Sequence, residues 1–387
     1  MPISTPELRS GCASNRPLRV LLVSPDYPPA LGGIQRLLHR ITLAMPQAET
    51  RVITLDHPAA MEFDSTQSQE IIRIGIGVTR ASVRNALFNA AAIIRAPRWQ
   101  PDVILNGHVV TGPAATVLAR RYRARNVLYT FGKEVAGRPE MTAWTLRRSD
   151  AGIAVSDFTR SLVVEAFGGR PLPCPVSVIH PGVEVPPAPE THSTVRPTIL
   201  TTARLRDWYK GHDRILEALP TVLQSIPDAQ WIVIGDGPIR PVLEERTRRL
   251  NLGDSVRFLG AVSDEERDRW LASANVFAMP ARYPKGEIGG EGFPVVYLEA
   301  AAWALPAIAG NVGGPREAVL NDQTGLLVNP ESSNEIAHAL IRLLSDPTYA
   351  RRLGKQARSR VEDGFRWEQV GAQLENVLRA TIGVDRR

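Results

Sequence analysis

The sequence predicts an α/β protein in which two doubly wound domains face each other across a cleft. Short β-branched runs alternate with longer helical stretches, which is typical of parallel sheets covered by helices. The alternation stops in a proline-rich stretch at residues 184–197 (EVPPAPETHSTVRP) and then restarts. At 387 residues, the chain is long enough for two cores. We therefore predict an N-terminal domain at residues 1–185, a linker at 186–197, a C-terminal domain at 198–364, and a terminal helix at 365–387 that packs back on the first domain.

The first domain contains short runs rich in Val, Ile and Leu, each separated from the next by a longer stretch with helical periodicity. The predicted strands are Arg19–Val23, Arg51–Leu55, Val103–Leu105, Asn126–Thr130, Gly152–Val155 and Val176–Ile179. The predicted helices are Gly33–Ala44, Ala81–Arg95, Gly112–Arg123 and Asp157–Phe167.

The second domain repeats the alternation, and in open parallel sheets ligands bind at the carboxyl ends of the strands. Two such domains on one linker therefore predict a ligand cleft between their sheets. The predicted strands are Thr198–Thr202, Trp231–Ile234, Val256–Leu259, Val276–Met279, Ala307–Ala309 and Gly325–Val328. The predicted helices are Asp213–Gln224, Ile239–Leu250, Asp264–Ala272, Pro294–Ala304, Ser333–Leu344 and Trp367–Ile382.

The composition, 43% apolar and 22% charged, is that of a soluble globular protein. No segment approaches an uninterrupted apolar run of twenty residues, and residues 1–11 lack the apolar part of a signal peptide. The two cysteines, Cys12 and Cys174, form neither a disulfide framework nor a zinc motif. We therefore expect a cytoplasmic protein.

The net charge of +6 belongs to the N-terminal half, because residues 1–185 contain 21 Lys and Arg against 14 Asp and Glu. Five arginines between residues 73 and 98 have no acid between them, and Ala81–Arg95 within this stretch is an expected helix. A basic helix with Leu87 and Ile94 suits docking on an anionic lipid surface at the inner face of a membrane, while a solvated Arg face gives the same pattern. Nucleic acid is not an expected partner, since no helix-turn-helix, zinc or aromatic-platform motif accompanies the charge.

The stretch at residues 289–300 (GGEGFPVVYLEA) places an acid on each side of an apolar run. Pro294 suits a first helical turn because its φ is fixed and it lacks an N–H, so Glu291 lies in the preceding loop and Glu299 inside the helix. Both carboxylates can then face a cleft into which the free amides of the first turn also point. That arrangement suits a ligand with hydroxyls and phosphates. An acid at the helix dipole and a solvated Glu299 would have the same sequence.

Two further segments have features that suit phosphate binding. Gly32 and Gly33 lie where a strand passes into a helix, so the backbone can approach a phosphate there, although a plain turn uses the same residues. The Gly-x-Gly-x-x-Gly spacing of dinucleotide sites is missing. Residues 311–317 (NVGGPRE) repeat this arrangement in the second domain, whereas Gly235 begins a segment more typical of a tight turn.

Arg204 and Lys210 lie in one loop between a strand and a helix of the second domain. Two cations at a strand end suit a diphosphate leaving group, whose charge grows as the bond to it breaks. A solvated loop is the alternative, and Arg206 is the more typical case of it.

As a set, these segments resemble the retaining nucleotide-sugar glycosyltransferases of family four, which have the GT-B fold of two Rossmann-like domains. The segments PPALGGIQ and EGFPVVYLEA are most similar to GDP-mannose-dependent α-mannosyltransferases that act on lipid acceptors, such as phosphatidylinositol mannosyltransferases. The resemblance covers nearly the whole chain in matching order. It rests on Gly32-Gly33, Arg204 with Lys210, Phe258-Leu259-Gly260, Glu291-x7-Glu299, and Gly313-Gly314 with Glu317.

The resemblance implies a role for each motif, because a nucleotide sugar presents two polyols with a diphosphate between them. Glu291 would hold the hydroxyls of the donor sugar, and Glu299 would bind the ribose. Arg204 and Lys210 would neutralise the diphosphate. The other residues implied in the donor site are Gly32, Gly33, Gly292, Phe293, Pro294, Val295, Phe258 and Gly235.

The chain departs from the family pattern in two places. Members commonly carry a His soon after the strand that here leads into YTFGKE, and this chain has Phe131 and Lys133 there. His108, directly after another strand, would contact sugar or acceptor in its place, or serve as a structural His. Lys210 follows Arg204 by six residues, where five is frequent in the family.

The resemblance implies transfer from a nucleotide sugar to a lipid-linked, glycan or small-molecule acceptor, with the departing phosphate helping to deprotonate the acceptor on the same face. It implies no cofactor and no bound metal, and the chain lacks an Asp-x-Asp motif. The sequence leaves the base open among guanine, uracil and adenine. A UDP-sugar-dependent transferase, a non-hydrolysing sugar-nucleotide epimerase and a nucleotide-binding or membrane scaffold protein without turnover are the alternatives.

Overall fold

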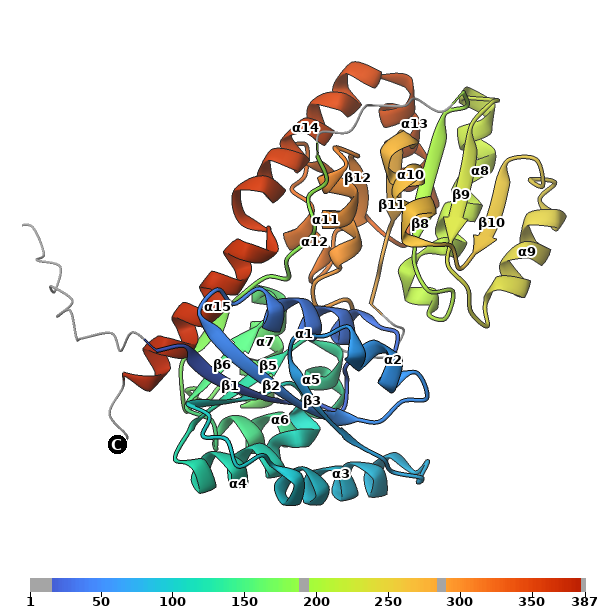
Figure 1. Ribbon diagram of the computed structural model, residues 1–387. Helices are drawn as coiled ribbons and strands as arrows, with labels where there is room; N and C mark the ends of the chain where they lie inside the picture. Colours follow the sequence, from blue (N-terminus) through green and yellow to red (C-terminus); the bar gives the residue numbers. More distant parts are fainter. Residues whose placement is uncertain (1–15, 188–194, 284–289, 384–387) are drawn as a thin grey trace, which may run out of the picture.

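The computed structural model describes residues 16–187, 195–283 and 290–383, which form two lobes joined along one side (Figure 1). Part of the predicted linker lies outside these residues, as do Cys12 and Gly289. Each lobe has a parallel sheet with helices packed on it, so the predicted fold of two doubly wound domains is confirmed.

The first sheet has the order β3-β2-β1-β4-β5-β6-β7 within the described residues, and every pair in it is parallel. Its chain order reverses between β1 and β4, which is where ligands of doubly wound sheets bind. The strands are β1 (Leu18–Val23), β2 (Ala48–Leu55), β3 (Glu70–Ile74), β4 (Val103–Asn106), β5 (Arg125–Thr130), β6 (Ala151–Ala154) and β7 (Val176–Val178). The helices are α1 (Gly33–Leu43), α2 (Ala60–Ser65), α3 (Ala81–Arg95), α4 (Gly112–Tyr122), α5 (Lys133–Gly137), α6 (Pro139–Leu146) and α7 (Asp157–Ala166), with a 3-10 turn η1 (Val109–Thr111).

The second sheet has the order β10-β9-β8-β11-β12-β13, again parallel throughout, and reverses between β8 and β11. The strands are β8 (Thr198–Thr202), β9 (Gln230–Ile234), β10 (Val256–Gly260), β11 (Val276–Met279), β12 (Ala307–Gly310) and β13 (Gly325–Val328). The helices are α8 (His212–Ser225), α9 (Arg240–Arg249), α10 (Asp264–Ser273), α11 (Val295–Ala302), α12 (Pro315–Ala318), α13 (Ser333–Ser345), α14 (Pro347–Gly364) and α15 (Trp367–Ile382), with a 3-10 turn η2 (Trp208–Lys210).

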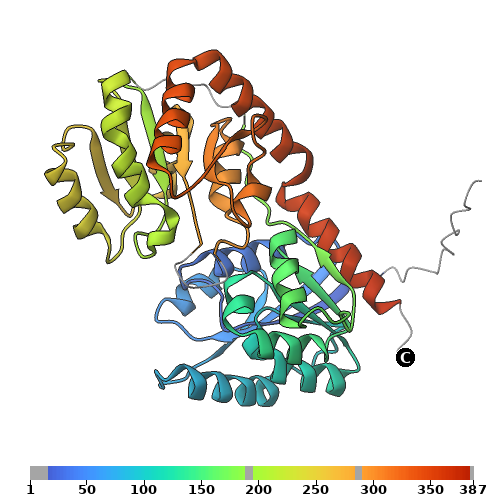
Figure 2. The same cartoon turned by 180° about the vertical axis from the view of Figure 1, so that it is seen from behind.

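The last two helices, α14 and α15, run along one side of the molecule from the second lobe to the first (Figures 1 and 2). Gly371 of α15 lies directly against Ala44 at the end of α1, which leaves no room for a β-carbon. The Glu375 carboxylate accepts a hydrogen bond from the amide of Gln47 at 2.8 Å. One apolar cluster includes residues of both sheets and of α15, so the core is continuous behind the boundary between the lobes.

The structure adds elements to those expected from the sequence. The strand β3 and the helices α2, α5, α6 and α14 were absent from the sequence prediction, whereas the short α12 follows the glycine pair of residues 311–317 as expected. Pro294 is the N-cap of α11 and the helix begins at Val295, one residue later than expected. None of the described helices is long and apolar enough to cross a membrane.

Candidate active site

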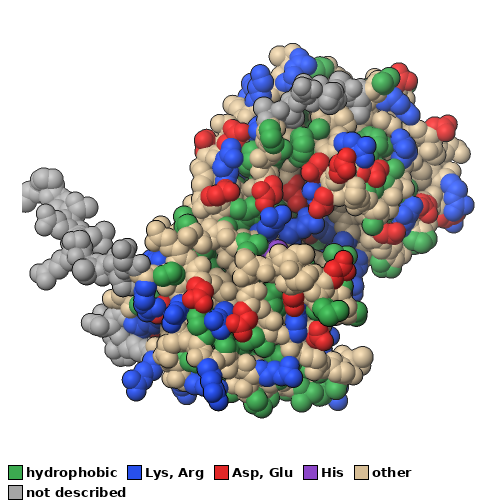
Figure 3. Space-filling view, in the orientation of Figure 1, with side chains coloured by type: hydrophobic (Ala, Val, Ile, Leu, Met, Phe, Trp, Pro, Cys, Tyr) green, Lys and Arg blue, Asp and Glu red, His purple; other side chains and the backbone are tan. Residues whose placement is uncertain are grey.

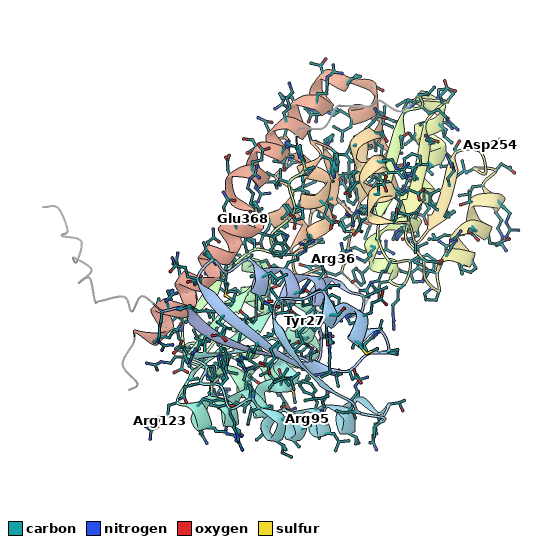
Figure 4. The ribbon with its side chains drawn as sticks, in the orientation of Figure 1. Tyr27, Arg36, Arg95, Arg123, Asp254 and Glu368 are labelled. Carbon is teal, nitrogen blue, oxygen red and sulfur yellow. The ribbon has the colours of Figure 1, made fainter. Side chains whose placement is uncertain are left out.

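The carboxyl ends of β1 and β8 both lead into loops at the boundary between the lobes. Figure 3 shows Lys and Arg side chains gathered in the hollow there, below acids of the second lobe. Arg36 of α1 lies at this boundary (Figure 4). The loops that the sequence analysis singled out therefore come from both sides of one hollow.

The centre of the second-domain half is an ion pair between Lys210 and Glu291. The Lys210 ammonium lies 2.6 Å from the Glu291 carboxylate, with side chains 12% and 19% exposed. Lys210 ends η2, and Gly211, with φ of +84°, then turns the chain into α8. Gly211 is packed against the carbonyl of Pro280, so the loop that carries Lys210 is fixed by a close backbone approach that only glycine permits.

The surroundings of Glu291 favour its ionised form. Burial alone would raise the pKa of Glu291, but the Lys210 charge, hydrogen bonds from Lys210 and Tyr209, and the charge of Arg204 together lower it. Burial raises the pKa of Tyr209, as does the Glu291 carboxylate, so the phenol stays a hydrogen-bond donor. Arg204 is exposed and therefore free to meet a ligand from the solvent side.

Glu299 lies on α11 and is in contact with a residue of the first domain. Arg36 of the first domain places its guanidinium 3.6 Å from the Glu299 carboxylate. Burial raises the pKa of Glu299, and the charges of Arg267 and Arg36 oppose that rise only in part. Glu291 and Glu299 thus face the same boundary from the loop before α11 and from the helix itself.

The N-terminus of α1 is open. Gly33 is its first residue, and a β-carbon built on Gly33 would meet nothing within 4 Å. The N-cap residue Gly32 has no side chain to satisfy the first amides, and the first turn carries no acid. These N–H groups are therefore available to an anion.

Other residues that the resemblance placed in the donor site point elsewhere. The Phe293 ring stacks on His180 at 4.7 Å between ring centres and on Phe365 at 6.2 Å, which buries it behind the cleft. The Phe258 ring packs edge-on against Trp231. Their side chains serve the core, so a donor could meet these two residues mainly through the backbone.

The glycines and apolar residues near this loop have identifiable places. Gly292 is buried against the carbonyl of Phe131 in the first domain, so a side chain there would separate the two domains. Pro294 caps α11, and Val295 opens it. Gly235 follows β9 with φ of +128° and lies against the carbonyl of Ala203, beside Arg204. The tight turn expected at Gly235 therefore adjoins the cationic loop.

His108 lies on the first-domain side, away from the Lys210–Glu291 pair. Its Nδ1 accepts a hydrogen bond from the amide of Val110 at 3.0 Å, which caps η1. Burial, reinforced by the charge of Arg138, lowers the pKa of His108 to about 4, so the imidazole is neutral at pH 7. A neutral imidazole whose Nδ1 is already an acceptor presents its Nε2–H as a donor.

His108 borders an open cavity of about 400 Å³ in the first domain. The loops after β1, β2 and β4, together with the start of α3 and the loop before α6, form its walls. Arg84 and Arg138 supply positive charge and make no ion pair with any described residue, while Nε of Arg84 is buried without a hydrogen-bond partner. The carboxylates in the wall are Asp26, which accepts a hydrogen bond from Gln35 at 2.9 Å, and Asp56.

We did not predict four of these residues as site residues from the sequence: Asp26, Arg84, Arg138 and Tyr209. Asp26 lies between the first predicted strand and the Gly32-Gly33 pair, so its position there was the available signal. The exposed Lys133, which stands where the family commonly has a His, places its ammonium 5.7 Å from the centre of the Tyr209 ring. Within the described ranges, no group of three or more His, Cys, Asp and Glu is arranged to hold a metal ion.

Two family descriptions match the chain. Residues 31–185 match Glycosyltransferase Family 4, and residues 187–360 match Glycosyl transferases group 1. Solved structures with the same fold include HepE of Anabaena in complex with UDP and glucose, with a TM-score of 0.75 and 18% identity over 94% of this chain and 100% of that one. Sucrose-phosphate synthase of Thermosynechococcus elongatus has a TM-score of 0.76 and 23% identity over 94% and 98%.

The alignments with relatives in sequence cover almost all of this chain and almost all of each relative. The GDP-mannose-dependent monoacylated alpha-(1-6)-phosphatidylinositol monomannoside mannosyltransferase of Corynebacterium glutamicum is 30% identical over 94% of this chain and 98% of its own. The GDP-mannose-dependent alpha-(1-6)-phosphatidylinositol monomannoside mannosyltransferase of Mycobacterium tuberculosis is 31% identical over 93% and 98%. The glycogen synthase of M. tuberculosis is 27% identical over 94% and 95%. This chain therefore belongs to the family-four glycosyltransferases of the GT-B fold, and it is a glycosyltransferase.

Proposed function

We propose that the protein transfers an α-mannosyl group from GDP-mannose to a lipid-linked acceptor, with retention of the anomeric configuration. The relatives at 30% and 31% identity carry names that specify this donor and a phosphatidylinositol mannoside acceptor, and they align over nearly their whole length. The observation that carries the proposal is the Lys210–Glu291 pair beside Arg204, because it sets cations and a sugar-binding carboxylate at one point of the boundary.

The chain's own residues can perform such a transfer in one site. The bond between the anomeric carbon and the diphosphate oxygen breaks, and the acceptor oxygen bonds to the same carbon from the same face. The acceptor proton passes to the departing phosphate. Arg204, Lys210 and the open amides of α1 stabilise the negative charge that grows on the diphosphate. Glu291 accepts hydrogen bonds from sugar hydroxyls, and Glu299 from the ribose.

The Lys210 ammonium contacts the Glu291 carboxylate at 2.6 Å. When the donor binds, Lys210 would exchange part of this contact for one with the diphosphate. A lysine has three N–H donors, so Lys210 can keep one contact with Glu291 and turn another toward the diphosphate. Glu291 would then be ionised and held in place before the sugar arrives. Charge that is placed in advance stabilises a transition state without further rearrangement. This charge pattern also supports a reaction without a bound metal or another cofactor, which we propose as well.

We place the acceptor in the first-domain cavity. Its lining combines hydrogen-bonding groups for a sugar or inositol ring, among them Asp26 and His108, with the unpaired guanidinium groups of Arg84 and Arg138. A phosphate of a lipid-linked acceptor would pair with these guanidinium groups. The cavity lies beyond the C-terminal ends of β1, β2 and β4.

The helix α3, whose first turns line this cavity, would bring the protein to an anionic membrane surface on the cytoplasmic side. Its side chains Leu87 and Ile94 are 45% and 79% exposed, and Arg95 lies at its end on the outer face of the first lobe (Figure 4). Apolar side chains next to arginines suit the interface of an anionic bilayer.

The test is a calorimetric titration of the protein with GDP-mannose, a UDP-sugar and an ADP-sugar, followed by transfer assays with the donor that binds. We expect GDP-mannose to bind most tightly and mannose to appear on a phosphatidylinositol mannoside acceptor. A new nucleotide sugar formed from the donor alone would favour the epimerase alternative. Tight donor binding without transfer or sugar release over an acceptor panel would favour a binding protein.

A further inference from the structure

Glu317, on the short helix α12 of the second domain, reaches across the boundary to the first domain. Its carboxylate accepts hydrogen bonds from the amides of Asp157 at 2.8 Å and Phe158 at 2.6 Å, the first two residues of α7. These amides have no partner within their own helix, and the N-terminus of a helix carries partial positive charge. A carboxylate from the other domain therefore completes the end of α7.

The N-cap of the same helix holds the loop of Glu291. The Ser156 hydroxyl accepts a hydrogen bond from the amide of Thr159 and donates one to the carbonyl of Gly292 at 2.6 Å. Gly292 directly follows Glu291 and lies against Gly132 of the first domain, where a β-carbon built on Gly132 would be 2.9 Å from the α-carbon of Gly292. One helix end in the first domain thus receives both Glu317 and the residue after Glu291.

The second domain encloses the same loop from the other side. Gly314, three residues before Glu317, is packed against the carbonyls of Glu291 and Gly292, with no room for a side chain. The backbone around Glu317 is itself anchored, because the guanidinium of Arg360 donates to the carbonyls of Glu317 at 2.7 Å and Ala318 at 2.6 Å. The loop of Glu291 therefore fits between the two domains only while α12 and α7 stay together.

We propose that Glu317 is a positioning residue that holds the two domains closed and thereby places Glu291 for the transfer reaction. It acts through the N-terminus of α7, and the contact needs both carboxylate oxygens and their charge. Two hydrogen bonds with one ionised partner are stronger than neutral ones. The inference rests on the proposed function only for its kinetic part, since closure of the domains can be measured without a substrate.

The consequences differ for binding and for catalysis. Arg204, Lys210 and Glu299 belong to the second domain, so the nucleotide would keep these contacts when the Glu317 contact is removed. The open amides of α1 would move away with the first domain, and they act on the charge that grows in the transition state. The loop of Glu291 would lose its contacts with the first domain. Glu291 would then no longer be held in a fixed position against the donor sugar in the transition state. A change that acts only in the transition state lowers kcat and kcat/KM without changing ground-state affinity.

The experiment compares the full-length protein with Glu317→Gln, which keeps the shape and one acceptor oxygen but removes the charge. The matched control is Glu335→Gln, because the Glu335 carboxylate accepts from the amide of Asn329 at 2.9 Å entirely within the second domain. The measurements are kcat with GDP-mannose and an acceptor, GDP affinity by calorimetry, the melting temperature, and the ligand-free radius of gyration by small-angle X-ray scattering.

For Glu317→Gln we expect kcat to fall about tenfold, GDP affinity to stay within about twofold, and the radius of gyration to rise. Glu335→Gln should change none of these. A Glu317→Gln protein with unchanged scattering and unchanged kcat would overturn the inference, and so would an equal loss of kcat in the control. If the unaltered protein transfers nothing from any donor, the proposed function fails. The comparison of the radii of gyration alone then tests whether Glu317 holds the two domains closed.

Discussion

The two sides of the cleft differ in how their charges are satisfied. On the second-domain side, Lys210 and Glu291 neutralise each other at 2.6 Å, and Glu299 faces Arg36. On the first-domain side, Arg84 and Arg138 line a cavity without an ion pair to any described residue, and the charge of Arg84 acts on the Asp26 carboxylate from beyond ion-pair distance. The first arrangement is preorganised by the protein, whereas the second leaves positive charge for a ligand to complete.

This difference separates what each side can contribute to the reaction. A pair of fixed, opposite charges costs little reorganisation when a transition state forms, so it can serve the chemical step. Unpaired guanidinium groups in a cavity instead favour an anionic ligand in the ground state, so they serve binding. The comparison therefore predicts that changes on the second-domain side lower kcat and that changes on the first-domain side raise KM.

The change with the largest expected effect is Glu291→Gln, which removes the charge that Lys210 faces. We expect kcat to fall by about 10²–10³-fold, as when a preorganised group in other active sites is removed, while the folded structure persists. Steady-state kinetics and a thermal melt measure the two effects. Glu244→Gln is the control, because Glu244 pairs with Arg240 at 2.7 Å on α9 of the same domain. If Glu291→Gln keeps half of the unaltered rate, Glu291 does not belong to the site.

The next effect concerns two histidines, the buried His212 on the second-domain side and the half-buried His108 on the first-domain side. Burial lowers the pKa of His212 to about 3, and neither of its ring nitrogens has a hydrogen-bond partner among the described residues. Burial likewise lowers the pKa of His108 to about 4. Because both folded pKa values lie below the ordinary value of 6.5, the unfolded chain binds more protons as the pH falls. Stability is therefore full above about pH 6.5 and declines below it.

We expect each histidine to remove up to about 2 kcal/mol of unfolding free energy between pH 6.5 and pH 5. Urea unfolding over this range measures the slope. His212→Leu should make the slope shallower, because the imidazole whose folded pKa is lowered is then gone. His338→Leu changes an exposed imidazole and should leave the slope as it is. An unaltered slope in His212→Leu would show that the His212 imidazole does not control acid stability.

The sequence predicted the fold well because most strands are continuous apolar runs between clear turn residues. The bounds of β8, β11 and β13 agree with the expected strands residue by residue. The edge strand β3 was missed because Glu70 is exposed, the next three side chains are only partly buried and Ile74 alone in the strand is buried, so its pattern is weak. The helix α14 was missed although its buried residues, such as Ala350, Leu353 and Ala357, recur at helical spacing, because most of that stripe is small and the rest of the helix is polar and charged.

The site was predictable to the extent that its residues lie in one segment. Glu291 and Glu299 share a stretch of sequence, and the residue types of the Arg204–Lys210 loop indicate anion binding. The pairing of Lys210 with Glu291 joins residues 81 positions apart, and no local pattern encodes it. The cavity on the other side was missed for the same reason, since its walls come from five separate segments. Tertiary packing, and not spacing along the chain, creates both.

The smallest effect tests the acceptor side directly. Arg84→Gln removes one of the two unpaired charges from the cavity, and Arg95→Gln removes an arginine from the far end of the same helix, outside the cavity walls. We expect Arg84→Gln to raise KM for a phosphate-bearing acceptor about tenfold, corresponding to one charge-assisted hydrogen bond, with kcat nearly unchanged. An acceptor without phosphate should show no such increase, and Arg95→Gln should affect neither acceptor in detergent solution. Equal losses for both acceptors would mean that Arg84 shapes the cavity without binding an anion, and the contrast between a preorganised donor side and an unsatisfied acceptor side would then not hold.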